Sequence, residues 1–374
     1  MMEDGLYLQA LGGERRALLI AEGTLQDLGI WYERQPLPGD LYLARITRIE
    51  RAIGVAFCSL GEGADGILPL DLAPNSLAEG QVLPLRIVRA AAPGKGPKLA
   101  PARVTPGLRS RPAPRLLKRE ADLLARFLRA DPDTIFVDSP KWREALDPRG
   151  VRARIEPIGF PAAVANALEA CVDALLQPEV RLVGGGSLLI EPGTTLTAVD
   201  VNMGSGGRGA VPRASLDLNR LALQGVARHL RLRSLAGRIL VDCLSEDSKT
   251  ARAALAQAMR AALAGDPERV QVKGVTVTGL LEITRRRGLY APLHELLLCP
   301  TAPVLTLRAE ASRFLRLLAG ERRSRPGIRW RLVLAQDLQA YLEGLDDWPD
   351  TARQLAQILP MEEKSEARYR LSEM

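Results

Sequence analysis

The chain has 374 residues, enough for two or three compact units with cores of their own. Its formal net charge of +7, carried mostly on arginine, favours phosphate-rich partners because a guanidinium group can donate two hydrogen bonds to phosphate oxygens. No basic patch precedes a long apolar run, and no segment reaches about 18 uncharged apolar residues, so we expect neither secretion nor a membrane span. The four cysteines lie far apart without a C-x-x-C pair, which indicates no disulfide framework and fits a reducing cytoplasm.

The first third of the chain is predicted to be rich in β-structure. Residues 16–32 have the pattern of a hairpin with Glu22 and Gly23 at its turn. From residue 39 to about 104, short alternating apolar runs separated by Gly and Pro predict a small five-stranded barrel. Barrels of this type bind single-stranded nucleic acid through an aromatic platform and a basic groove.

Three residues of this barrel are candidates for binding. Phe57 is the best candidate for stacking on a base; the alternative is that it belongs to the barrel core. Lys95 and Lys98, in P-G-K-G-P-K, are candidates for phosphate contacts, with solvated loop lysines as the alternative.

The middle of the chain alternates between helical and strand patterns. Residues 105–114 form a Pro- and Arg-rich linker, and the apolar spacing over 116–129 predicts an amphipathic helix. A strand is expected at 134–138, where it would complete one sheet with the N-terminal hairpin, and an amphipathic helix at 161–177.

Two strand-like runs then end on aspartates. The first, at 187–202, contains Asp200 and Asn202, and the second, at 237–242, ends at Asp242. An amphipathic helix starting at Pro212 joins them, and a strand–helix–strand crossover makes neighbouring parallel strands. Both carboxylates can therefore meet at one point, where hard oxygen ligands suit Mg²⁺ or Mn²⁺. The alternative is that each aspartate only caps a strand or turn.

The helix and loops around these strands carry further basic residues. The helix is expected to leave Arg228, Arg231 and Arg233 outside and to stop near Gly237. The glycine-rich G-S-G-G-R-G loop could bring Arg208 to a phosphate, and a mobile loop is the alternative. No G-K-[ST] follows, so the sequence does not favour a nucleotide-binding P-loop.

A helix at 249–263 and a strand at 269–278 follow Asp242. Three adjacent arginines come next and cannot share one face, so one or two are expected to contact phosphate. Arg285 and Arg286 are the candidates, and Arg269 and Lys273, which flank the preceding strand, are weaker ones.

Four motifs in order closely resemble the bacterial ribonuclease E/G family, over roughly residues 16–299. L-T-A-V-D-V-N followed by L-R-L-R-S-L-A-G-R-I-L-V-D is similar to its catalytic region, and G-L-L-E-I-T-R-R-R-G to the segment after the catalytic strands. G-D-L-Y-L-A-R-I-T-R-I-E with A-F-C-S-L-G-E-G-A-D-G-I-L-P-L resembles its inserted S1 domain, and P-G-K-G-P-K-L-A the exit from that domain.

The resemblance implies a Mg²⁺-dependent endoribonuclease that cleaves single-stranded RNA, with Mn²⁺ as an alternative metal. Asp200 and Asp242 would bind the metal, and Asn202 would orient Asp200 or the phosphate. A further family carboxylate is Ser245 in this chain, where Glu246 or Asp247 could substitute for it.

The chain departs from the family pattern at three places. Ile67 occupies the position of a second platform aromatic, so weaker stacking is expected. Residues 105–114 replace a domain that binds the RNA 5′-monophosphate, so cleavage is expected not to depend on that end group. Cys299 lacks the second cysteine of a zinc knuckle, so we expect no structural zinc and no zinc-linked homo-oligomer.

The implied fold class is α/β with an inserted OB-type S1 barrel and a small C-terminal α+β unit. Residues 1–35 and 109–176 would form an RNase H-like domain, 36–108 the S1 domain, 177–298 a DNase I-like catalytic subdomain, and 299–374 a linker and small domain. A catalytically silent S1-type RNA-binding protein is the main alternative, and a DNA nuclease or nucleotidyl transferase is a third.

Overall fold

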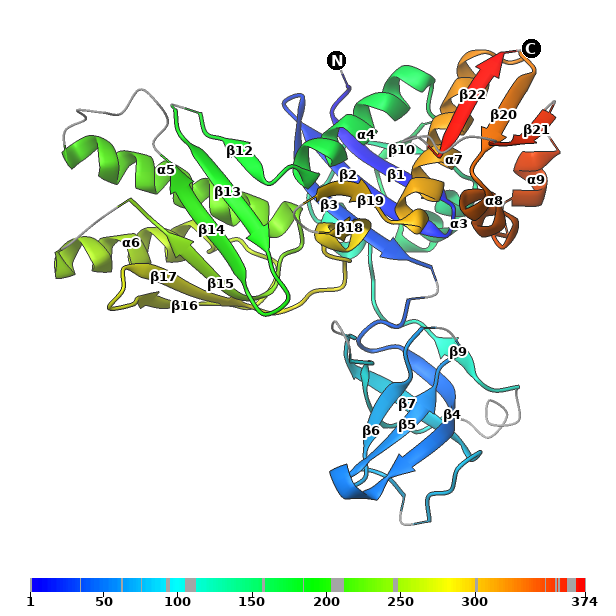
Figure 1. Cartoon of the computed structure of the whole chain (residues 1–374), viewed down its shortest axis with the longest axis horizontal. Coiled ribbons are helices and arrows are strands. Elements are labelled where there is room, and N and C mark those ends of the chain that lie inside the picture. Colours follow the sequence, from blue (N-terminus) through cyan, green and yellow to red (C-terminus); the bar gives the residue numbers. More distant parts are fainter. Residues whose placement is uncertain are drawn as a thin grey trace. The chain divides into compact units, whose positions relative to one another are not determined.

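The computed structural model describes residues 2–373 apart from 34, 62, 75, 92–94, 105–111, 157–158, 184, 203–211, 245–247, 300–301, 347, 354, 356 and 362–367. The chain divides into two compact units, one made of Met1–Trp31 with Arg126–Met374 and the other of Tyr32–Ala125. Each unit is described by itself (Figure 1). Among the described helices, none has the length and apolarity needed to cross a bilayer.

The smaller unit is a closed barrel, as the sequence predicts. Its sheet has the order β5-β6-β8-β7-β4-β9, and a further β5–β4 pairing closes it. The strands are β4 (Leu41–Glu50), β5 (Val55–Ser59), β6 (Gly66–Pro69), β7 (Val82–Arg89), β8 (Lys98–Pro101) and β9 (Arg115–Lys118), with the 3-10 turn η1 (Arg51–Ile53) after β4. Alternate residues such as Ala56, Cys58 and Leu99 fill the interior.

The helix predicted over 116–129 is wrong. Residues Arg115–Lys118 form β9, which pairs antiparallel with β4, and Leu116 packs against the barrel core. The helix is limited to α2 (Ala125–Leu128), because the Asp122 carboxylate accepts hydrogen bonds from the backbone N–H groups of Leu124 and Ala125 and starts the first turn there.

The larger unit begins with a five-stranded sheet of order β11-β10-β1-β2-β3. Its strands are β1 (Gly5–Leu11), β2 (Glu14–Ala21), β3 (Thr24–Tyr32), β10 (Thr134–Val137) and β11 (Arg154–Ile155). The predicted hairpin turn is confirmed, with positive φ at Glu22 and Gly23 and both backbone N–H groups donating to the Asp4 carboxylate. β10 runs parallel to β1, which confirms that the 134–138 strand joins the hairpin in one sheet.

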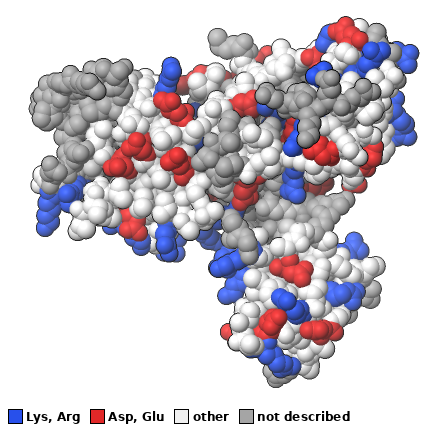
Figure 2. Space-filling model, viewed as in Figure 1, with Lys and Arg blue, Asp and Glu red and all other residues white. Residues whose placement is uncertain are grey.

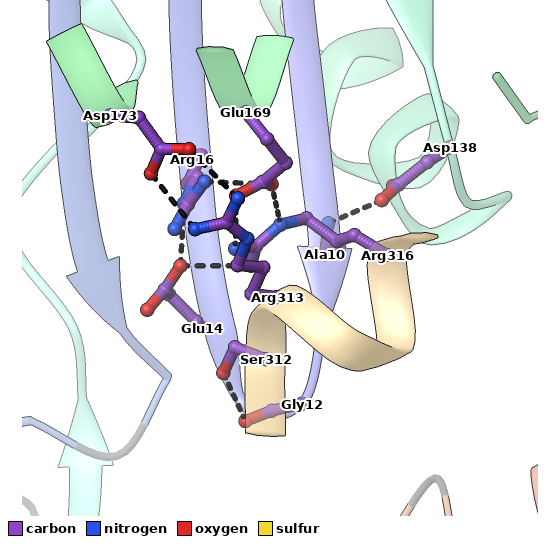
Figure 3. Close-up of polar contacts among 10 residues, drawn as sticks. All are labelled: Ala10, Gly12, Glu14, Arg16, Asp138, Glu169, Asp173, Ser312, Arg313 and Arg316. Atoms are coloured by element: carbon purple, nitrogen blue, oxygen red, sulfur yellow. Dashed lines mark hydrogen bonds and ion pairs between the residues drawn. The ribbon is translucent and has the colours of Figure 1, made fainter. Parts of the chain in front are cut away.

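A network of buried charges lies beside this sheet (Figure 3). Arg16 of β2 and Arg316 of α7 (Leu307–Ser324) each donate to Glu14 and to Glu169 of α4 (Ala162–Leu176) at 2.6–3.0 Å. Burial would raise the pKa of Glu169, but the two arginines hold it at about 2. Two carboxylates and two guanidinium groups thus neutralise one another, which a buried cluster requires.

The second sheet of this unit has the order β12-β13-β14-β15-β17-β16. Its strands are β12 (Glu179–Arg181), β13 (Ser187–Pro192), β14 (Thr197–Asn202), β15 (Gly237–Asp242), β16 (Val270–Val275) and β17 (Leu280–Arg285). Helices α5 (Pro212–Leu232) and α6 (Lys249–Ala262) pack against one face through Leu223, Val226 and Met259 (Figure 1). The helices predicted at 161–177 and 249–263 are therefore confirmed as α4 and α6.

The end of α5 differs from the prediction in two respects. The helix stops at Leu232, where Ser234 takes the left-handed conformation at φ 50° and the Leu235 N–H bonds to the Leu230 carbonyl; Gly237 instead opens β15. The arginines predicted to lie outside also do not project freely into solvent. Arg228 and Arg231 donate to backbone carbonyls of β3, and Arg233 is 4% exposed.

The C-terminal part mixes helices and strands, as predicted. It contains the hairpin β18 (Leu297–Cys299) and β19 (Ala302–Leu305), and the sheet β21-β20-β22 with α7 packed against it. The strands of that sheet are β20 (Trp330–Leu334), β21 (Gln357–Pro360) and β22 (Tyr369–Glu373), and this part also contains η3 (Leu293–Leu296), α8 (Gln336–Glu343) and α9 (Trp348–Ala352). Earlier in the chain, α3 (Lys141–Leu146) and η2 (Asp147–Arg149) lie between β10 and β11.

Candidate active site

Asp200 and Asp242 lie side by side at the ends of two neighbouring parallel strands. β14 and β15 pair in parallel, and the last aligned pair is Asp200 with Asp242. Neighbouring strands are about 4.8 Å apart. Val199, Val201 and Val241 point into the core beneath α5, so the two carboxylates project from the opposite face, as strand alternation requires. The convergence predicted from the sequence is thus found in the strand register.

Asparagines hold this site on two sides. The Asn202 amide Nδ2 donates to Asp200 Oδ2 at 2.9 Å, which orients one carboxylate. Asn219 of α5 is fully buried, and its side chain both accepts from the Leu244 N–H at 3.0 Å and donates to the Leu244 carbonyl at 3.1 Å. This pair of bonds ties the chain just after Asp242 to the helix.

Sequence reasoning missed Asn219, although a signal for it existed. Asn219 precedes Ala222, Leu223 and Val226 at the three- and four-residue spacing of the apolar stripe. A polar side chain at a core position of such a stripe is uncommon, because its amide must find partners in the interior.

The side chains present fit a divalent cation such as Mg²⁺. Neither Asp200 nor Asp242 forms an ion pair with any residue that the structure describes. Two adjacent carboxylates and an amide offer hard oxygen atoms, and Mg²⁺ is commonly held by one or two carboxylates with the rest of its shell supplied by water and phosphate. In the described part of the chain there is no cluster of three or more candidate ligands, and Ser245, Glu246, Asp247 and Arg208 lie outside it.

The prediction that Arg285, the last residue of β17, contacts RNA phosphate is wrong. Arg285 is 2% exposed, and its guanidinium forms a two-pronged ion pair with Asp266 at 2.9–3.1 Å and donates to the Leu235 carbonyl at 2.8 Å. A buried guanidinium with these partners cannot contact RNA. It anchors the turn before β16 to the start of β15.

Arg286, Arg269 and Lys273 are exposed, as a binding role needs. Their positions differ, however. Arg285 is paired with Gly237, five residues before Asp242, so the Arg286 and Arg269 end of the sheet lies about 17 Å from the aspartates at about 3.3 Å per residue. Contacts there would be made with nucleotides some distance from the carboxylate pair.

Arg181 of β12 is a basic residue on the aspartate side of the sheet. It aligns with Ser187 of β13, which aligns with Asn202 of β14, and it is exposed. Val180 packs against the core, so Arg181 projects from the face that carries the aspartates. No motif pointed to it in the sequence, since only the strand order brings it near.

The barrel carries its candidate residues on the outer surface. Phe57 is half-buried while its neighbours Ala56 and Cys58 are in the interior, so the alternative of a core phenylalanine does not hold. The Arg48 guanidinium lies 4.6 Å from the Phe57 ring centre. Phe57 aligns with Arg48 and with Ile67, and Ile67 aligns with Lys98, so four neighbouring strands place these residues in one row.

We call this row the outer stripe; it consists of Arg48, Phe57, Ile67 and Lys98. Lys95 is exposed near its Lys98 end. Figure 2 shows basic and acidic side chains mixed over the face that it draws, so among the described residues the net charge is not gathered into one patch there.

The chain combines an OB-type barrel, which carries an aromatic and basic outer stripe, with a sheet that holds two carboxylates at adjacent strand ends. These features define an α/β protein with an OB-type barrel. The profile of the Ribonuclease E/G family matches residues 103–288, about half of the chain, and includes both aspartates. The chain belongs to this family.

Individual relatives agree with this assignment. The chain is 35% identical over 191 residues to Ribonuclease E of Nostoc sp., which covers 47% of this chain and 28% of that protein. It is 31% identical over 197 residues to Ribonuclease E of Escherichia coli, covering 48% and 18%, and 32% identical over 139 residues to the chloroplastic Ribonuclease E/G-like protein of Arabidopsis thaliana, covering 36% and 14%. The matches thus span less than a third of the length of each of these three relatives.

Proposed function

We propose that this protein is a metal-dependent endoribonuclease that cleaves single-stranded RNA. The observation that carries the proposal is the in-register pair of Asp200 and Asp242 on parallel strands, within the segment matched by the Ribonuclease E/G family. The relatives named Ribonuclease E support RNA as the substrate.

Asp200 and Asp242 would supply carboxylate ligands to Mg²⁺, or to Mn²⁺ as an alternative. The bound metal would activate a water molecule and offset the charge that develops on the phosphodiester during in-line attack. Asn202 fixes the Asp200 carboxylate through its amide, and Asn219 restrains the chain after Asp242. Both asparagines therefore reduce the reorganisation that the two carboxylates undergo on metal binding.

Each unit offers groups for RNA binding. The outer stripe offers the Phe57 ring for stacking and Arg48 and Lys98 for phosphate. On the larger unit Arg181, Arg286, Arg269 and Lys273 are exposed and available for phosphate contacts.

We further propose that cleavage does not require a 5′-monophosphate and that no structural zinc is bound. β8 ends at Pro101 and β9 begins at Arg115, a separation far too short for a domain of typical size. Cys299 has no second cysteine nearby in the sequence, and its side chain lies outside the described part of the structure. The two sheets of the larger unit would correspond to the RNase H-like and DNase I-like domains, and any homo-oligomer would be held together without zinc.

Cleavage of an A/U-rich single-stranded RNA by purified protein tests the function. We expect cutting that requires Mg²⁺ and stops with EDTA, and loss of cutting in Asp200→Asn and Asp242→Asn without loss of RNA binding. Glu191→Gln is the matched control, because Glu191 is an exposed carboxylate in the same sheet, opposite Ala198 and two residues from the aspartate row.

Two outcomes would replace the proposal. Cutting by both aspartate variants at the wild-type rate would remove the active-site assignment. RNA binding without any cleavage, with each metal tried, would favour the catalytically silent RNA-binding protein. A single-stranded DNA of matched sequence included in the same assay identifies a DNA nuclease.

A further inference from the structure

Arg233 is a buried cation without a negative partner in the described part of the chain. It follows the last residue of α5 and is 4% exposed. Its Nε donates to His229 Nδ1 at 3.2 Å, while its Nη2 is buried and makes no hydrogen bond in the described structure. Burial lowers the pKa of His229 to about 3, so this imidazole is a neutral acceptor and contributes no charge.

The Arg233 side chain lines a small cavity together with His294. The Nδ1 atom of His294 is also buried without a hydrogen bond in the described structure. The other walls include Leu175, Ile190, Leu235 and Leu297, and none of the described lining residues is acidic. The cavity volume is about 10 Å³, about what one water molecule needs.

The surroundings compensate the Arg233 charge only in part. A buried charge is costly unless it is paired. The C-terminal end of α5 supplies a partial negative charge of about one half. A water molecule between Nη2 and Nδ1 would satisfy both hydrogen-bonding atoms but would leave the remaining positive charge uncompensated. A small anion would accept from Nη2 and, with His294 in its Nδ1–H tautomer, from Nδ1 as well.

We propose that this cavity binds a monovalent anion of the size of chloride, held by Arg233 Nη2 and His294 Nδ1–H. Chloride is only slightly larger than water, whereas a phosphate or nucleotide exceeds the available volume. The site lies where α4, β13 and α5 meet β18. β13 pairs with β14, and α5 leads into β15, so the anion would brace the two aspartate strands at the end away from the aspartates. This inference does not depend on the proposed function.

Thermal unfolding at constant ionic strength, with chloride or bromide exchanged for gluconate, tests the proposal on the full chain. We expect Tm to rise with the logarithm of the halide concentration above the dissociation constant, with an increase of about 2 °C when the halide is about tenfold above that constant. Arg233→Met should remove the halide dependence. Arg286→Met, which removes an exposed arginine of the same unit, should retain it.

A second measurement stands if Arg233→Met does not fold. Wild-type crystals grown in bromide should give an anomalous peak within hydrogen-bonding distance of Arg233 Nη2. Equal Tm values in halide and gluconate, or a cavity that holds only water in the bromide crystals, would overturn the proposal.

Discussion

Replacing Phe57 by alanine separates RNA binding from folding, because the ring lies on the barrel surface. Its neighbours Ala56 and Cys58 fill the interior, so removal of the ring creates no core cavity. The substitution removes the cation–π interaction with the Arg48 guanidinium, which lies 4.6 Å from the ring centre. An exposed interaction of this kind contributes about 0.5–1 kcal/mol. We therefore expect Phe57→Ala to lower the free energy of unfolding by no more than about 1 kcal/mol.

The effect on binding should be larger. A base stacked on an aromatic ring contributes about 1–3 kcal/mol, so the dissociation constant of Phe57→Ala for RNA should be roughly 5- to 150-fold larger than that of the wild type. Stacking releases no counterions, so the slope of log K against log salt should not change. Arg48→Ala should instead reduce that slope by about 0.7 if Arg48 contacts one phosphate. Ile67→Phe should strengthen binding at constant slope.

Fluorescence anisotropy with a labelled single-stranded RNA, at several salt concentrations, measures both quantities, and thermal melts of the same preparations report folding. Ile53→Ala is a suitable control, since Ile53 is an exposed apolar residue of the same unit outside the outer stripe. Unchanged affinity per folded molecule in Phe57→Ala would refute the stacking role.

Three further outcomes are expected. Arg316→Met removes one of the two arginines that bind Glu14 and Glu169, so urea titration should show a free energy of unfolding about 3–5 kcal/mol lower than that of the wild type. Arg313→Met should lower it by less than about 1 kcal/mol, because the Arg313 ion pair is partly exposed. Equal losses in the two variants would contradict the buried network. Burial raises the pKa of Asp138 to about 6 from the usual 3.8, so its stabilising effect is full below about pH 4 and is lost as the pH rises through 6. Wild type should lose about 3 kcal/mol of stability from this group between pH 4 and 7, and a chemical-denaturation series in which Asp138→Asn shows the same fall would exclude it as the source. Matched RNAs with 5′-monophosphate, 5′-triphosphate or 5′-hydroxyl ends should be cut at similar rates, and a strong preference for monophosphate would mean that another surface senses the end group.

The sequence predicted the aspartate pair because local patterns and one topological rule were sufficient. Two apolar runs with a helix between them imply parallel neighbours, and Asp200 and Asp242 stand at equivalent positions of those runs. The hairpin turn at Glu22 and Gly23 and the barrel were predictable for the same reason, since their partners are near in the sequence.

What the sequence could not predict depends on distant partners. In the sequence, nothing distinguishes Arg285 from an exposed arginine, because its partners Asp266 and the Leu235 carbonyl lie 19 and 50 residues away. Residues 116–129 have helical apolar spacing, but residues 115–118 pair with β4, which lies far away in the sequence, and Leu116 packs against the barrel core. The role of Arg181 follows from strand order, which no single run of residues encodes.

The ion pair between Glu14 and Arg316 joins residues 302 positions apart, which bears on how the chain folds as it is synthesised. At about 5–20 residues per second, Arg316 emerges from the ribosome roughly 15–60 s after Glu14. During that interval Glu14 can pair with Arg16, and Arg16 can later pair with Glu169 as well. All strands of the barrel lie between Leu41 and Lys118, so its partners emerge together. We expect the barrel to complete its folding on the nascent chain while the first sheet still awaits α7.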